Sequence, residues 1–159
     1  MSWSARLAEL GVVLPPVATP AGAYLPAVRS GGLVFTAGQL PMVGGVLAAT
    51  GKLGEGIDVE HGRQLARTCA LNALAAVADL VGLDAVVRVV KVVGFVASAP
   101  GFTAQAAVLN GASELLTEVF GSAGRHARSA VGVAELPLGA PVEVELIVEV
   151  GGHSGDSAR

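Results

Sequence analysis

Charge and aromatic rings are both scarce in this chain. Of its 159 residues, only 14% are charged and only 4% are aromatic, and the formal net charge at pH 7 is −3. Proteins that bind nucleic acid need a basic surface for the phosphates and aromatic side chains on which bases stack. The few lysines and arginines are scattered along the chain, so the sequence predicts no nucleic-acid partner.

Cysteine occurs once and histidine three times. The single cysteine excludes an internal disulfide and any cysteine-based metal cluster. The residues around Cys69 have helical spacing, which favours a buried structural thiol over the alternative of a reactive nucleophile. The histidines, His61, His126 and His153, lack the HxxxH or related spacing of metal ligands, so we expect no metal site.

Long hydrophobic runs free of charge are also missing. The best candidate for a membrane span, residues 68–87, contains Asn72, Asp79 and Asp84. Each aspartate would cost about 2.5–3.5 kcal/mol near the centre of a bilayer. The opening segment MSWSARLAEL lacks the cationic and apolar regions of a signal peptide. We therefore expect a cytoplasmic protein that makes no contact with a membrane.

What the chain has in excess is alanine and valine. Hydrophobic residues make up 52% of the sequence, and the mean hydropathy of +0.64 is high for a soluble protein. A chain of this length is typical of one domain with one core. We expect that domain to span residues 1–150, with an N-terminal extension at 1–19 and a disordered polar tail at 151–159. The remaining apolar surface predicts burial between subunits.

Periodicity predicts strands and helices in a fixed order. Apolar spacings of three and four residues predict two helices, and a nearly continuous run of valines between them predicts a central strand. A turn at Ser30–Gly32 predicts a β-hairpin ahead of the first helix. The expected elements are a hairpin within 27–41, helices at 59–81 and 102–120, a strand at 86–98, and two last strands joined around 136–139. That order predicts an α+β fold in which both helices cover one face of a mixed sheet, leaving the other face to be covered.

An arginine opens the first of the two last strands. Side chains alternate across a strand, so Arg128 shares a face with Ala130 and Gly132. We interpret the two strands as a hairpin, which sets Ala130 opposite Glu145 and Gly132 opposite Glu143. Arg128 then has two interpretations. It forms a surface ion pair with a glutamate, or it presents its guanidinium beside a space, cleared by the small residues, that admits the carboxylate of a ligand.

Three stretches of the chain resemble conserved blocks of one family. They are GAYLPAVRSGGLVFTAGQLP at residues 22–41, VLNGASELLTEVFG at 108–121 and ARSAVGVAELPLGAPVEVE at 127–145. On these blocks the sequence resembles the Rid proteins, also called the YjgF family, whose best-known members are imine deaminases. The resemblance covers roughly residues 20–150. It implies a chorismate-mutase-like α+β fold and a homotrimer with a site in each cleft between subunits.

The resemblance also implies roles for four residues. In the deaminases, an arginine at the position of Arg128 binds the carboxylate of the substrate, and a tyrosine at the position of Tyr24 lines the same cleft. The glutamate at the position of Glu143 helps to position the attacking water. Asn110 matches a helix asparagine that supports the cleft.

Two positions depart from the family pattern. Ala130 stands where the deaminases commonly have cysteine, and His126 stands where they often have proline. The backbone carbonyl at Ala130 could still assist in the substrate site. His126 is either a plain loop residue or a side chain that points into the cleft with Arg128 and acts near neutral pH.

The function that the resemblance implies is hydrolysis of small 2-imino acids, or of enamine tautomers such as 2-aminoacrylate, to 2-keto acids and ammonia. No cofactor is required, because the protein supplies orientation, a proton relay and stabilisation of charge. The alternative is a non-catalytic trimer that binds carboxylate metabolites or partner proteins in the same clefts. A ribonuclease activity attributed to some relatives is disfavoured by the negative net charge.

Overall fold

A computed structural model describes residues 2–20 and 22–152. The predicted disordered tail lies outside the described residues from position 153 on, and so does His153. The helices are α1 (Trp3–Glu9), α2 (Val59–Val81) and α3 (Gln105–Phe120), with single turns η1 (Leu83–Ala85), η2 (Gly121–Gly124) and η3 (Pro137–Gly139). The long strands are β1 (Ala27–Ser30), β2 (Leu33–Thr36), β7 (Val86–Ala97), β8 (Ala127–Val133) and β9 (Val142–Val150). The short strands are β3 (Met42–Val43), β4 (Val46–Leu47), β5 (Lys52–Leu53) and β6 (Gly56–Ile57).

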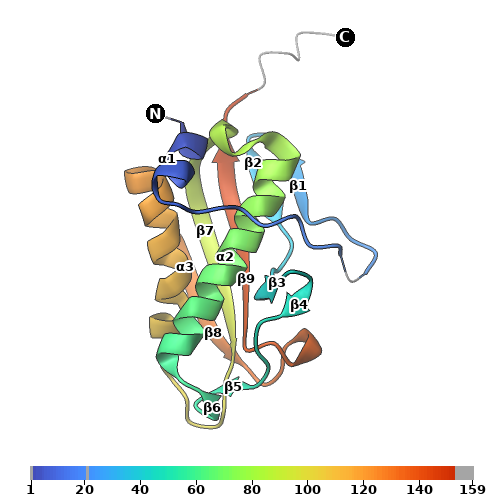
Figure 1. Ribbon diagram of the computed structural model, residues 1–159, viewed down its shortest axis with the longest axis vertical. Helices are drawn as coiled ribbons and strands as arrows, with labels where there is room; N and C mark the ends of the chain where they lie inside the picture. Colours follow the sequence, from blue (N-terminus) through green and yellow to red (C-terminus); the bar gives the residue numbers. More distant parts are fainter. Residues whose placement is uncertain (1, 21, 153–159) are drawn as a thin grey trace.

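The long strands form one sheet in the order β1-β2-β9-β7-β8. β7 and β8 run parallel and the other neighbours run antiparallel, so the sheet is mixed. Helices α2 and α3 lie side by side across one face of the sheet, as Figure 1 shows. The predicted α+β fold is confirmed, and so are the first hairpin (β1 and β2), both helices and the strand at β7. The second helix begins at Gln105 rather than at residue 102.

The core lies between the sheet and the two helices. Alternate residues of β9, from Val142 to Val150, are buried against the helices. The cap of α2 is formed by Asp58, whose side chain accepts a hydrogen bond from the backbone N–H of His61. The helix ends at Gly82, whose φ of 78° suits glycine. The buried residues of α2 recur at helical spacing, so its apolar side faces the sheet.

The two helices approach each other most tightly at Gly111 of α3. A Cβ at this position would overlap the backbone carbonyl of Arg63 in α2. We expect Gly111→Ala to lower the free energy of unfolding by about 1–3 kcal/mol, because the helices must move apart. Gly32→Ala is the control, since its Cβ would meet only the carbonyl of Val150 at 3.8 Å. Urea denaturation of both variants checks this, and equal stabilities would contradict the close helix contact.

The last two strands do not pair with each other. β7 lies between them, parallel to β8 and antiparallel to β9. The predicted hairpin, which set Ala130 opposite Glu145 and Gly132 opposite Glu143, is therefore wrong. The physical reason is that α3 connects β7 to β8. Two strands joined by a crossover helix commonly pair side by side and run parallel.

The observed register moves Arg128 away from the glutamates. Arg128 is level with Val92 of β7, and Val92 is level with Leu146 of β9. Both of these residues are buried under the helices, so Arg128 lies on the helix-covered face. Glu143 and Glu145 alternate with the buried residues of β9 and lie on the opposite face. The prediction that Arg128 shares a face with two carboxylates is wrong for the same reason as the hairpin.

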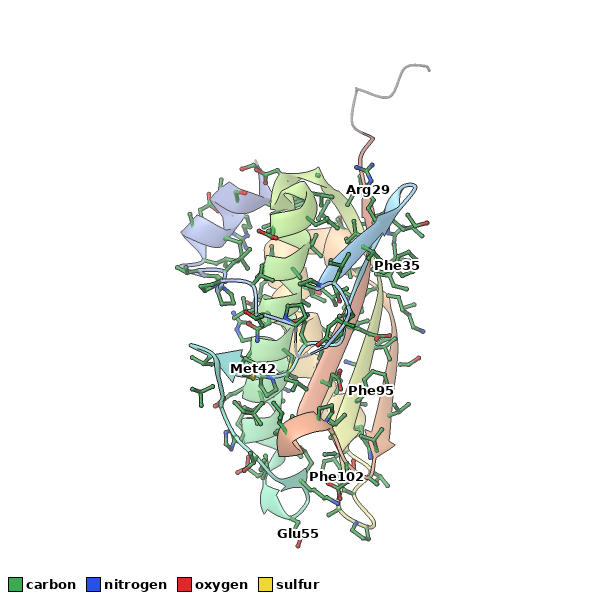
Figure 2. All side chains as sticks on the ribbon, turned by 90° about the vertical axis from the view of Figure 1, so that its right-hand side faces the viewer. Arg29, Phe35, Met42, Glu55, Phe95 and Phe102 are labelled. Carbon is green, nitrogen blue, oxygen red and sulfur yellow. The ribbon has the colours of Figure 1, made fainter. Side chains whose placement is uncertain are left out.

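The other face of the sheet is uncovered in the single chain. Figure 2 shows Phe35 and Phe95 pointing to this side, away from the helices. Val28 and Val131, which pair with them in register, are 47% and 43% exposed. An apolar surface of this kind marks an interaction site in soluble proteins. Its apolar members include Val28, Leu33, Phe35, Val93, Phe95, Val131 and Ile147.

The N-terminal segment packs against one end of the domain. The indole N–H of Trp3 in α1 donates to the carbonyl of Val86 at 2.7 Å. Its ring meets that of Phe120 edge to face, with centroids 5.2 Å apart. Arg6 donates to the carbonyl of Glu118 at 3.1 Å. The expected N-terminal extension is therefore docked on α3 and β7 in the part that the structure describes (Figure 1).

Candidate functional site

Arg128 reaches from β8 to one side of α3. Its Nη1 donates to Asn110 Oδ1 at 2.9 Å and to Ser113 Oγ at 3.1 Å, and its Nη2 donates to the carbonyl of Ala106 at 3.2 Å. These acceptors are spaced by four and three residues, which aligns them on one helix face. All three are neutral, and none of the ion pairs among the described residues involves Arg128. The interpretation of Arg128 as a surface ion pair with a glutamate is wrong.

The guanidinium keeps donors for a ligand. A guanidinium carries five N–H groups in one plane. The contacts with α3 use both hydrogens of Nη1 and one of Nη2. The N–H of Nε and the second hydrogen of Nη2 donate to no residue within the described ranges. Nε and Nη2 form one edge of the plane, the fork that can pair with both oxygens of a carboxylate.

His126 belongs to the same group of side chains. Its Nε2 lies 2.9 Å from Ser113 Oγ, and its Nδ1 lies 2.6 Å from the carbonyl of Gly124. Burial lowers the pKa of His126 below its ordinary value; the hydrogen bond to Gly124 opposes this shift, and the charge of Arg128 adds to it. His126 thus points to the same side as Arg128, although it bonds to Ser113 and not to the guanidinium.

Ser113 is the member of this group that sequence reasoning missed. The resemblance implied Asn110, which contacts Arg128 directly. Ser113 lies three positions further along the same helix and contacts Arg128 and His126. Helical spacing from Asn110 was the signal that could have found it. We call Arg128, Asn110, Ser113 and His126 the arginine group.

The small residues beyond Arg128 do not leave an open space. Ala130 is half-buried and packs against the core. A Cβ at Gly132 would lie 2.7 Å from Gln105 Nε2 and 3.0 Å from Ser98 Oγ. The space predicted there is therefore filled by the side chains of Gln105 and Ser98, which no strand pattern reveals, and a larger residue at position 132 would have to displace the flexible end of Gln105.

Glu143 belongs to a second group, on the uncovered face. A Cβ at Gly38 would overlap its carboxylate oxygen, so the absence of a side chain at Gly38 makes room for it. Burial raises the pKa of Glu143 above its ordinary value, and the negative charge of Glu145 raises it further. A carboxylate with a raised pKa is a stronger base than an ordinary glutamate and is better suited to accept a proton.

Tyr24 lies close to Gly38 at a small hollow. The hollow has a volume of about 90 Å³, and its lining includes Tyr24, Gly38, Gln39 and Leu138. Tyr24 itself is 51% exposed. Leu138 has a φ of 60°, a conformation that is rare for a branched residue and concentrates at functional sites. We call Tyr24, Gly38 and Glu143 the glutamate group.

One chain does not bring the two groups together. The arginine group lies at the helix-covered side of β8, which is an edge strand. Glu143 lies on the opposite face of β9, and β7 separates β9 from β8. The structure therefore joins Asn110 and His126 to Arg128, and Tyr24 to the surroundings of Glu143, but it leaves Arg128 and Glu143 apart.

Cys69 lies inside the core, in α2. It is 0% exposed, and burial raises the pKa of its thiol, with the charge of Glu143 adding to the shift. The expectation of a buried thiol is confirmed. We expect a water-soluble disulfide reagent to label Cys69 only after unfolding, because the thiolate is the reactive form. We also expect Cys69→Ala to leave turnover nearly unchanged. Rapid labelling of the native protein, followed by absorbance of the released thiol, would contradict this placement.

The described part of the chain holds neither a cluster of metal ligands nor a membrane-spanning helix. Among residues 2–20 and 22–152, no group of three or more His, Cys, Asp or Glu side chains could hold a metal ion. No helix in the described part of the chain is both long and apolar enough to cross a membrane.

Comparisons with known proteins cover almost the whole chain. The family model described as endoribonuclease L-PSP matches residues 16–150. Protein TCP17 of Trypanosoma cruzi is 49% identical over an alignment of 151 residues that covers 92% of this chain and 93% of that protein. The crystal structure of Atu1372 from Agrobacterium tumefaciens, a protein of unknown function, is 45% identical with a TM-score of 0.86, and 94% of each chain is covered.

Further solved structures carry descriptions that bear on function. A protein from Shewanella oneidensis, provisionally described as an endoribonuclease, is 32% identical with a TM-score of 0.91, covering 94% of this chain and all of that one. Escherichia coli TdcF, solved with bound serine, is 26% identical with a TM-score of 0.62, covering 85% of this chain and 94% of that one. The YjgF gene product of E. coli is 27% identical with a TM-score of 0.60, covering 85% and 98%. The chain thus belongs to the endoribonuclease L-PSP family, which is the YjgF or Rid family that its sequence blocks resemble.

Proposed function

We propose that this protein hydrolyses small 2-imino acids, or enamine tautomers such as 2-aminoacrylate, to 2-keto acids and ammonia. The observation that carries the proposal is the state of Arg128. Three neutral acceptors on α3 hold its guanidinium, and no described carboxylate neutralises it. A fixed cation with an open fork is suited to an anionic ligand. The bound serine of TdcF, which carries a carboxylate, supports a ligand of this kind.

The chemistry needs little beyond orientation and proton transfer. The substrate carboxylate binds to the fork of Arg128, which fixes the position of the C=N carbon. Water adds to that carbon while Glu143 accepts a proton from the water, and the imine nitrogen takes up a proton from solvent. Glu143 then returns its proton to the amino group of the carbinolamine, the C–N bond breaks to release ammonia, and the hydroxyl proton passes to solvent, giving the 2-keto acid. The raised pKa of Glu143 suits a group that both accepts and returns a proton.

We further propose a homotrimer whose sites lie between chains. The uncovered face carries apolar side chains that burial against other subunits would remove from water. Arg128 and Glu143 lie on opposite faces of one sheet, and assembly can bring the arginine group of one chain to the glutamate group of the next. Light scattering should give a mass of three times 15.7 kDa. A monomer at micromolar concentration would rule out such a site.

A second candidate function is binding without catalysis. It is favoured by Ala130, which stands where the deaminases commonly have cysteine. A trimer of this kind would bind carboxylate metabolites or partner proteins in the same clefts. Endoribonuclease activity, which gives the family model its description, receives no support from a net charge of −3 and an aromatic content of 4%.

One assay separates these functions. 2-Aminoacrylate and larger imines are generated in situ by a partner enzyme, and keto acid release is timed with and without this protein. Acceleration above the rate in buffer supports the deaminase. Binding of 2-oxobutanoate, a small 2-keto acid of the product class, without faster release of keto acid supports the non-catalytic module. Cleavage of RNA at comparable protein concentration, with neither of the other results, would overturn both.

A further inference from the structure

We propose that Ser113 and His126 are positioning residues, which hold Arg128 in the orientation that presents its fork to the substrate carboxylate. This inference rests on the proposed function and extends it to two side chains that do not touch the substrate. The geometry that carries it is a continuous chain of hydrogen bonds. It runs from the carbonyl of Gly124 through His126 and Ser113 to Nη1 of Arg128.

The direction of each hydrogen bond follows from the carbonyl at the start of the chain. A carbonyl oxygen can only accept, so Nδ1 of His126 carries the hydrogen that points to Gly124. The Nε2 atom of the neutral ring is then an acceptor, and the hydroxyl of Ser113 donates to it. The lone pairs of that oxygen are left to accept from Arg128. His126 thereby decides which way the Ser113 hydroxyl points.

Without His126, the Ser113 hydroxyl would have a competing partner. A serine inside a helix commonly donates to the backbone carbonyl four residues earlier in the same helix. Such a bond turns the oxygen along the helix and away from a neighbouring strand. By accepting the hydroxyl hydrogen, His126 keeps the oxygen directed toward β8, where Arg128 lies.

The contacts of Nη1 control the plane of the guanidinium. Nη1 has two hydrogens, and Asn110 and Ser113 accept one each at 2.9 and 3.1 Å. With both bonds made, and with Ala106 accepting from Nη2, rotation about the bonds next to Nε is blocked. Loss of the Ser113 acceptor leaves one partner at Nη1 and lets the fork turn. The predicted consequence is weaker carboxylate binding with little change in the chemical step.

The test compares Ser113→Ala, His126→Phe and His126→Gln, with the exposed Ser122→Ala as the matched control. Imine hydrolysis gives kcat and KM, calorimetry gives the Kd of 2-oxobutanoate, and thermal unfolding gives Tm. We expect Ser113→Ala and His126→Phe to raise KM and Kd by about 10- to 150-fold, the effect of losing one hydrogen bond to a charged group. Both variants should keep kcat within about threefold and Tm near that of the wild type.

His126→Gln should restore KM and Kd, because the amide oxygen of glutamine can accept the Ser113 hydroxyl hydrogen. Long-range ¹⁵N–¹H spectra of the wild-type histidine rings add a reading that needs no variant. They should show His126 protonated at Nδ1 and unprotonated at Nε2.

Different results would contradict the positioning role of Ser113 and His126 and the proposed function. Unchanged KM and Kd in Ser113→Ala, or a wild-type ring protonated at Nε2, would overturn the positioning role and leave the proposed function standing. A wild-type protein that neither hydrolyses imines nor binds 2-oxobutanoate would overturn the proposed function, and the positioning role with it.

Discussion

Replacing Arg128 by lysine should be nearly as damaging as replacing it by alanine. Lysine keeps the positive charge, but its ammonium lacks the planar fork of Nε and Nη2 and cannot reach three acceptors on α3 at once. Both substitutions remove the proposed charged contact between the Arg128 guanidinium and the substrate carboxylate, which lies in a partly desolvated cleft. We expect kcat/KM for imine hydrolysis to fall by a factor of about 10² to 10³ in both variants.

The fold should survive both substitutions at Arg128. Its partners on α3 are neutral and can bind water instead, so no charge is left buried and unpaired. Arg125→Lys is the matched control, because that side chain is exposed just before the same strand and should tolerate the change. Turnover, calorimetric binding of 2-oxobutanoate and Tm are measured for each variant. An active Arg128→Lys protein, or a loss of Tm with binding intact, would contradict the role of Arg128 as a carboxylate clamp.

Replacing Glu143 by glutamine should remove catalysis and spare binding. Glutamine keeps the size of the side chain next to Gly38 but cannot accept a proton from water. We expect kcat to fall by a factor of about 10² to 10⁴. The Kd of 2-oxobutanoate should change little, because Arg128 makes the carboxylate contact. Equal losses of binding in the variants of Arg128 and Glu143 would contradict this division of roles.

The raised pKa of Glu143 gives the wild-type protein a pH dependence that the charge of Glu145 affects. The reaction needs the ionised carboxylate, so kcat should fall on the acid side at a higher pH than an ordinary glutamate would cause. Glu145→Gln removes the neighbouring charge and should move this acid limb to lower pH. Rate profiles of the two proteins check this, and a limb that stays in place would exclude Glu143 as its cause.

The same shift affects stability with a defined sign. Because the folded-state pKa lies above the unfolded one, the folded state favours the protonated acid. Its stabilising contribution is fully present below the unfolded pKa and is lost as pH rises through the folded pKa. Above that range, Glu143→Gln should be more stable than the wild type, as measured by Tm at pH 8. A carboxylate kept at this cost is typical of a functional residue.

Local patterns predicted the elements well, because periodicity reports which side of each element is buried. The valine run of β7 and the spacing of apolar residues in α2 are examples. The pairing of β8 was not local information, since α3 separates it from β7 in sequence while β7 adjoins it in space. We assumed that consecutive strands form a hairpin, and that assumption put Arg128 beside Glu143 and Glu145.

Only some residues of the site could be predicted, because contacts between separate elements are not visible in local patterns. Arg128 was found from its place at the start of a predicted strand and Asn110 through the resemblance of whole sequence blocks, and the structure joins them directly. Ser113 and Gln105 belong to no pattern that strand parity can show, since their contacts cross from α3 to β8. The filling of the space beside Gly132 by Gln105 was missed for this reason.

The central claim is that imine hydrolysis takes place at sites built from two chains, with Arg128 from one and Glu143 from the next. The most direct test mixes Arg128→Ala and Glu143→Gln chains, each inactive alone, by co-expression with two different tags. Each site then draws its arginine and its glutamate at random, so about one quarter of the sites contain both and about one quarter of wild-type turnover should return. Doubly tagged trimers that contain both chains and show no turnover above that of the separate variants would contradict the account.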